Sequence, residues 1–201
     1  MTRIVLASTS AARQAMLEAA RVPFDSIAPA VDEPAIRMLE RARGVTPFAL
    51  AGVLANAKAV EVSARRDMHS RTLVVGADQT LELDDRAIDK AGSSGELWET
   101  LAALSGRTHM LHAAVVVARD GASVWTHTET ARLTMRALSP GFLEDYLSRH
   151  GESVRSSLGG YWYEAEGVQL FERVDGDYFT ILGLPLIPLL NFLRQEGALP
   201  T

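Results

Sequence analysis

Apolar runs and helical periodicities alternate along this chain, and they predict an alternation of strands and helices. Continuous or alternating apolar positions predict strands near residues 3–7, 24–28, 72–76, 108–119, 123–134 and 168–172. Apolar positions three and four residues apart predict helices near residues 11–20, 47–66, 95–104, 140–149 and 185–195. Because hairpins and helical connections both join the strands, we expect an α/β fold with a mixed sheet.

Turn residues divide these elements. Asp120-Gly121 separates two long strand patterns and is a typical hairpin turn. Asp84-Asp85 lies between the alternating apolar positions on either side of it and predicts a second hairpin. The Arg-rich stretch 35–46 is expected to be a mobile segment.

The composition is that of a globular protein, with 47% hydrophobic and 22% charged residues among 201. No apolar run reaches the roughly 18 residues of a membrane span, and the first residues lack the regions of a signal peptide. We therefore expect one domain over residues 1–201 in a soluble intracellular protein. The chain has no cysteine, which excludes disulfides, thiolate metal sites and a cysteine nucleophile.

The net charge of −5 gives no overall attraction to nucleic acid polymers or to a membrane surface. An anionic substrate must therefore be held by a local group of donors or by a bound cation. Of the 20 basic residues only Lys58 and Lys90 are lysines. Codon bias explains an excess of arginine, but a compact ammonium also differs from a planar guanidinium where space around a phosphate is tight.

The first candidate site lies between the first predicted strand and helix, in Ser8-Thr9-Ser10-Ala11-Ala12-Arg13. Hydroxyls, backbone N–H groups at a helix start and a cation one turn further along can bind an anion. The alternative is that Ser10 is only the N-cap of the helix, which is the commoner role of a serine there.

Acidic residues form the second candidate. Asp78 follows an apolar strand and two small residues, Gly76 and Ala77, where an open α/β sheet binds ligands. Asp32-Glu33 is a carboxylate pair in a predicted loop, and it suits a hard cation. Both positions have a plainer interpretation as turn residues. His109 and His112 are not a metal pair, because their spacing on a strand puts them on opposite faces.

Eight short motifs follow one another between residues 4 and 193. They are Leu6-Ala7-Ser8-Thr9-Ser10 with Arg13, Val31-Asp32-Glu33, Leu54-Ala55-Asn56-Ala57-Lys58-Ala59, Gly76-Ala77-Asp78-Gln79, Asp89-Lys90, Leu104-Ser105-Gly106-Arg107-Thr108-His109, Gly176-Asp177-Tyr178, and Leu182-Gly183-Leu184-Pro185-Leu186. Each motif alone is weak, but in this order they resemble the Maf family of nucleoside triphosphate pyrophosphatases.

The resemblance implies an elongated α/β fold with a strongly twisted mixed sheet, flanking helices and two lobes around a central cleft. It also implies a cytoplasmic location and allows a homodimer. It implies hydrolysis of a nucleoside triphosphate to a monophosphate and pyrophosphate, with a house-cleaning role toward modified nucleotides. Asp78 would be the catalytic base, and Glu33 with Asp78 would hold a divalent cation, Mg²⁺ or Mn²⁺. The phosphate-binding residues implied are Ser8, Ser10, Arg13, Lys58 and Lys90.

Three positions bear on the choice of nucleobase. Gln79 and Glu164 are similar to the branch that resembles 7-methyl-GTP pyrophosphatase, whereas the dTTP/UTP branch carries Thr and Gln there. Ala12 departs from the aromatic residue of the methylated-guanine branch. A dTTP/UTP or broad-range enzyme, or a nucleotide-binding regulator of septum formation, therefore remains an alternative.

Overall fold

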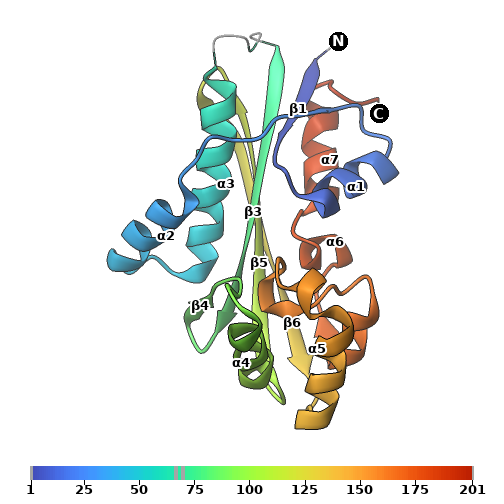
Figure 1. Ribbon diagram of the computed structural model, residues 1–201. Coiled ribbons are helices and arrows are strands. Elements are labelled where there is room, and N and C mark those ends of the chain that lie inside the picture. The colour runs from blue at the N-terminus through green and yellow to red at the C-terminus, as the bar shows by residue number, and fades with distance from the viewer. Residues whose placement is uncertain (1, 66–67, 69–70, 201) are drawn as a thin grey trace.

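The computed structural model describes residues 2–65, 68 and 71–200 (Figure 1). The strands in this part of the chain are β1 (Arg3–Ala7), β2 (Asp25–Ser26), β3 (Thr72–Leu83), β4 (Arg86–Ile88), β5 (Thr108–Arg119), β6 (Ala122–Met135) and β7 (Phe171–Asp175). They form one sheet in the order β2-β1-β3-β5-β6-β7, with β4 paired to β3. β1 is parallel to β2 and β3, and the other pairs are antiparallel, so the predicted mixed α/β sheet is confirmed.

Helices cover both faces of this sheet (Figure 1). The α-helices are α1 (Ala11–Ala19), α2 (Glu33–Ala42), α3 (Pro47–Ser63), α4 (Ser94–Leu104), α5 (Pro140–Val154), α6 (Tyr178–Ile181) and α7 (Leu186–Gln195), and the 3₁₀ turns are η1 (Leu158–Gly160) and η2 (Glu166–Leu170). Most of these helices begin with an N-cap side chain that accepts a backbone N–H of the first turn. The N-cap residues are Ser10, Asp32, Thr46, Ser93 and Ser139. No helix in the described ranges combines the length and apolarity that crossing a membrane requires.

The Arg-rich stretch at 35–46, for which the sequence predicted a mobile segment and no helix, is helical over Glu33–Ala42. Asp32 caps α2 by accepting the N–H of Ala35, and Pro34 lies in the first turn, where a proline is tolerated. None of the residues of α2 is buried, which explains why no apolar periodicity revealed it. Its charged residues, rather than an apolar face, hold it in place.

Several other boundaries differ from the sequence-based prediction. The second strand is limited to Asp25–Ser26, and the strand expected near 168–172 begins only at Phe171, because η2 occupies the preceding residues. The short helix α6 was not predicted. The helix expected over 47–66 ends at Ser63, and its expected end at Arg66 lies outside the described residues.

The long strands take part in two separate apolar clusters on one face of the sheet. β3 contributes Leu73 and Val75 to the cluster with α1 and α7, and Leu81 to the cluster with α4 and α5. α3 covers the opposite face through small residues such as Ala55 and Ala59, which permit close packing. The two clusters correspond to the two lobes that were expected.

Between these clusters one edge of β3 is open. β1 pairs with β3 as far as Gly76, and β4 begins to pair at Leu81. Among the described strands, residues 77–80 therefore pair only with β5, on the other edge. Asp78 and Gln79 lie in this gap, where a ligand can approach them.

Candidate active site

A cleft of about 1440 Å³ lies at the open edge of β3. Residues from α1, α2, α3, β3, the segment after β4 and the loop after η1 line it. The ten residues singled out from the sequence all belong to this lining, namely Ser8, Ser10, Ala12, Arg13, Glu33, Lys58, Asp78, Gln79, Lys90 and Glu164. The structure thus brings together side chains up to 156 positions apart, since Ser8 and Glu164 share one cavity.

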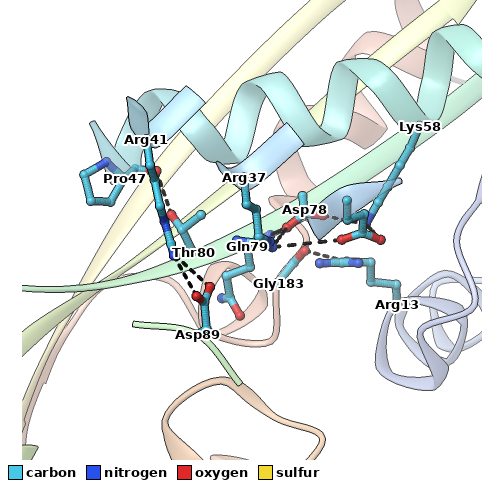
Figure 2. A network of polar contacts seen from close by, with 11 residues as sticks. Arg13, Arg37, Arg41, Pro47, Lys58, Asp78, Gln79, Thr80, Asp89 and Gly183 are labelled. Atoms are coloured by element: carbon cyan, nitrogen blue, oxygen red, sulfur yellow. Dashed lines mark hydrogen bonds and ion pairs between the residues drawn. The ribbon is translucent and has the colours of Figure 1, made fainter. Parts of the chain in front are cut away.

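Asp78 is the most enclosed carboxylate of the cleft, with 4% of its surface exposed. Lys58 Nζ lies 2.5 Å from Asp78 Oδ2 and 2.8 Å from Glu33 Oε1, so one ammonium bridges the two carboxylates. Arg37 Nη2 donates to Asp78 Oδ1 at 3.2 Å (Figure 2). The backbone N–H of Gln79 donates to the same oxygen at 2.7 Å.

Opposing effects determine the charge of this carboxylate. Burial alone would raise the pKa of Asp78, but the charges of Lys58, Arg13 and Arg37, and the hydrogen bond from Lys58, lower it below its ordinary value. Asp78 is therefore ionised at neutral pH. A buried carboxylate that remains charged can accept a proton or a cation.

Close packing of α3 against β3 places Lys58 next to Asp78. A Cβ added to Gly76 would lie only 2.3 Å from the backbone oxygen of Ala55 and 2.7 Å from the nitrogen of Ala59, so only glycine allows this approach. Lys58 precedes Ala59 on α3, and the same close contact brings its side chain to Asp78.

Arg13 and Gln79 form the opposite wall of the site. Arg13 Nε donates to the carbonyl oxygen of Gly183 at 2.9 Å. The side-chain nitrogen of Gln79 donates to the carbonyl oxygens of Thr180 and Ile181, at 2.9 and 3.0 Å, and so ties β3 to α6. Burial lowers the pKa of Arg13, although the charges of Asp78 and Glu33 oppose this shift.

Ser10 has the capping role, and both Ser8 and Ser10 also line the cleft. Ser10 Oγ accepts the N–H of Arg13 as the N-cap of α1, and Ser8 Oγ accepts the N–H of Ser10. Both residues also line the cleft at the start of this helix. A helix start facing a cleft offers N–H groups and a positive dipole end to an anion.

Helix α2 contributes two cations that the sequence interpretation missed. Glu33, Arg37 and Arg41 follow one another at intervals of four and therefore share one face of the helix. Arg41 makes a bidentate pair with Asp89, both contacts at 2.7 Å, immediately before Lys90. This spacing of charged residues was the signal that could have identified both the helix and its cleft-facing side.

Lys90 is the second lysine of the cleft. Desolvation lowers its pKa from the ordinary value, the nearby charge of Arg13 lowers it further, and Asp78 and Glu33 act in the opposite sense. Lys58 and Lys90, the only lysines of the chain, thus both lie in this one cavity. The described cleft lining combines five cationic side chains with four carboxylates, namely Arg13, Arg37, Arg41, Lys58 and Lys90 with Glu33, Asp78, Asp89 and Glu164.

Glu33 and Asp78 alone do not enclose a metal ion. No group of three or more ligating His, Cys, Asp or Glu side chains occurs in the part of the chain that the structure describes. Mg²⁺ is nevertheless commonly held by one or two carboxylates together with substrate phosphates. The hard oxygens of Glu33 and Asp78, already spanned by the ammonium of Lys58, fit a cation that binds jointly with a phosphorylated substrate.

The histidines lie on opposite faces of the sheet, as predicted. His109 Nε2 is hydrogen-bonded to Tyr161 Oη at 2.7 Å, on the face of the second apolar cluster. His112 contacts Glu82 and Thr130 and packs against the ring of Phe48 on α3. Neither belongs to the lining of the cleft.

An open edge of a mixed α/β sheet, with several cations around a buried carboxylate, defines a binding cleft for a multiply charged anion. The Maf-like protein family matches residues 3–196, and the chain belongs to that family. It is 51% identical over 199 residues to a nucleoside triphosphate pyrophosphatase of Caulobacter vibrioides, covering 99% of this chain and 98% of that protein. It is also 46% identical over 197 residues to a 7-methyl-GTP pyrophosphatase of Rhizobium etli, with 98% of each chain covered.

Proposed function

We propose that this protein hydrolyses nucleoside triphosphates to a nucleoside monophosphate and pyrophosphate. The observation that carries the proposal is the ionised, buried Asp78 among Lys58, Arg37 and Arg13 in a cleft large enough for a nucleotide. The full-length similarity to proteins named as nucleotide pyrophosphatases supports it. We include in the proposal that residues 1–201 act as one domain in the cytoplasm, where nucleoside triphosphates occur.

The cations receive the triphosphate in this proposal. A triphosphate carries about four negative charges at neutral pH, which this chain of net charge −5 must offset locally. Lys58, Lys90 and Arg13 contact phosphate oxygens, with Arg37 as a fourth donor, and stabilise charge that develops in the transition state. Ser8 and Ser10 hold a phosphate at the start of α1.

Asp78 is the general base of the proposed reaction. It takes a proton from the attacking water, an oxygen–phosphorus bond forms at the α-phosphorus, and the bond from that phosphorus to the bridging oxygen breaks to release pyrophosphate. Phosphate oxygens compete with Asp78 for Lys58 and Arg37, and this competition frees a carboxylate oxygen for the proton. Glu33 keeps the second contact to Lys58 in the meantime.

We propose Glu33 and Asp78 as the protein ligands of a divalent cation, Mg²⁺ or Mn²⁺, that binds together with the substrate. Such an ion supplies neutralisation of the phosphate charge and polarisation of the phosphoryl group. Pyrophosphate release should accordingly stop on addition of a chelator and return with excess Mg²⁺.

For base selection we propose Ala12, Gln79 and Glu164. A 7-methylguanine ring is positively charged, and the carboxylate of Glu164 therefore favours it over a neutral pyrimidine. The side-chain nitrogen of Gln79 is engaged by α6, so only its carbonyl oxygen is free to face a substrate. Glu164→Gln should lower the ratio of 7-methyl-GTP to dTTP hydrolysis, and an unchanged ratio would remove Glu164 from this role.

The central test is pyrophosphate release from a panel of nucleotides by Asp78→Asn. Asparagine keeps the shape but cannot act as base, and we expect turnover to fall by at least about 10²-fold. Asp85→Asn, in the exposed turn at the end of the same strand, is the matched control and should retain activity. Near-normal turnover of Asp78→Asn would exclude this base, and absence of pyrophosphate release by the natural protein would favour a binding role.

A further inference from the structure

The aromatic rings of the cleft come from one short run of the chain. In the cavity lining that the structure describes, Tyr161, Trp162 and Tyr163 are the only aromatic residues. Apart from Arg13, the residues of α1 in the lining are Ala11, Ala12 and Ala15, whose side chains are single methyl groups. A flat apolar surface for a planar ligand can therefore come only from this run.

Two of the three rings are already used in packing. Tyr161 is 5% exposed, is hydrogen-bonded to His109, and meets Phe171 edge-on at 4.9 Å between ring centroids. Tyr163 packs against Phe171 and Tyr178. Their rings belong to the wall of the second apolar cluster rather than to the open space of the cleft.

Trp162 differs from both neighbours. It is 41% exposed, and it takes part in no ring–ring contact among the described residues. An indole buries more apolar surface than almost any other side chain when it is covered, so leaving it open in a cavity gives up stability that packing would supply. Its place in the cleft indicates a surface that a ligand covers.

The backbone that carries this indole is fixed. The carbonyl oxygen of Trp162 accepts the N–H of Ala165 at 3.2 Å. A Cβ on Gly167 would lie 2.5 Å from the same oxygen, so the chain on both sides of Gly167 is packed as closely as a glycine permits. An exposed ring on a rigid backbone binds a planar partner at little entropic cost.

We propose that the indole of Trp162 is the stacking surface for the nucleobase. This inference rests on the proposed function, because it assigns the base end of a cleft whose other end holds the triphosphate. The face of an indole carries negative potential, so Trp162 favours electron-poor or cationic bases. Glu164, two residues further along the same loop, adds a negatively charged carboxylate that also favours a cationic base.

Binding without turnover is the test, and α,β-methylene analogues of GTP and UTP serve as probes because they cannot release pyrophosphate. Removing an aromatic ring from a base stack weakens binding about 5- to 150-fold, which is the loss we expect for Trp162→Ala. Trp162→Phe should keep most of the affinity. Inorganic triphosphate, which has no base, should bind Trp162→Ala as it binds the natural protein.

Trp98→Ala is the matched control, since Trp98 is 40% exposed but lies on α4 away from the cleft lining. It should leave all affinities unchanged. The inference is overturned if Trp162→Ala binds the nucleotide analogues as tightly as the natural protein does. It is also overturned if the affinity of Trp162→Ala for inorganic triphosphate falls as much as its affinity for the nucleotide analogues. Because no step requires hydrolysis, a protein that binds but does not hydrolyse nucleotides would refute the proposed function without affecting this result.

Discussion

Replacement of Gly76 by alanine tests the link between packing and chemistry in this fold. The new Cβ would point at the backbone of α3, 2.3 Å from the oxygen of Ala55, where ordinary contact begins at 3.4 Å. Because backbone atoms cannot rotate away, α3 must move from β3 by about 1 Å. Overpacking of this kind costs about 1–3 kcal/mol of the free energy of unfolding.

The same displacement acts on the site. Lys58 lies on α3 between the two residues that the new Cβ would strike, and its contact to Asp78 is only 2.5 Å long. A misplacement of about 1 Å at a catalytic group lowers activity by roughly 10²-fold, which is the effect we expect on kcat/KM. Stability and activity should therefore fall together in Gly76→Ala.

Urea unfolding and pyrophosphate release measure the two effects. Gly52→Ala is the control, because Gly52 lies on the same helix with no atom within 4 Å of an added Cβ. It should keep full activity and gain up to about 1 kcal/mol of stability from the better helix former. A Gly76→Ala protein with the urea midpoint and turnover of the natural chain would show that the approach of α3 does not position Lys58.

Three further predictions concern individual side chains. Lys58→Arg and Lys90→Arg keep the charge but replace a compact ammonium by a planar guanidinium, and we expect lower turnover in both. Full activity in both would support codon bias as the reason why the chain has only two lysines. Arg37→Gln should raise KM by about tenfold or more through loss of a charged donor, whereas Arg43→Gln, at the exposed end of α2, should not; equal effects would contradict a phosphate contact. Burial lowers the pKa of His109 to about 4, so the folded protein favours its neutral form, and stability is lost as pH falls from about 6.5 toward 4. Between pH 7 and 5 the free energy of unfolding, measured in urea, should fall by about 2 kcal/mol. His109→Gln should abolish this fall, and His127→Gln should leave it unchanged.

Local signals in the sequence predicted most of the elements. The cap at Ser10 and the hairpins at Asp84-Asp85 and Asp120-Gly121 depend on neighbouring residues alone, and the structure contains all three. Helix α2 was missed because its contacts are ionic and reach residues such as Asp78, far away along the chain. An apolar periodicity cannot reveal a helix that buries no residue.

The limits at the site have a similar origin. The motifs indicated that Lys58 and Asp78 belong to one cleft, but not that Lys58 bridges Asp78 and Glu33. The motifs also indicated Gln79 as a specificity group, but not that its side-chain nitrogen holds the carbonyl groups of α6. Side-chain direction depends on packing between distant segments, which a single sequence does not encode locally.

The continuous strands also determine how this cleft can change its width. β3, β5 and β6 run unbroken past both apolar clusters, so the lobes are joined by a stiff ribbon rather than by a flexible connection. Domain closure in enzymes usually relies on a few hinge residues that absorb large changes in φ and ψ, and a paired strand has no such freedom. Among the described elements around the cleft, α2 is anchored by ion pairs and buries no residue, so we expect it to move around a substrate more readily than the sheet does. The sheet is thus the rigid part of the cleft and α2 the movable part. Because rising ionic strength weakens exposed ion pairs, it should loosen α2 before it affects the sheet.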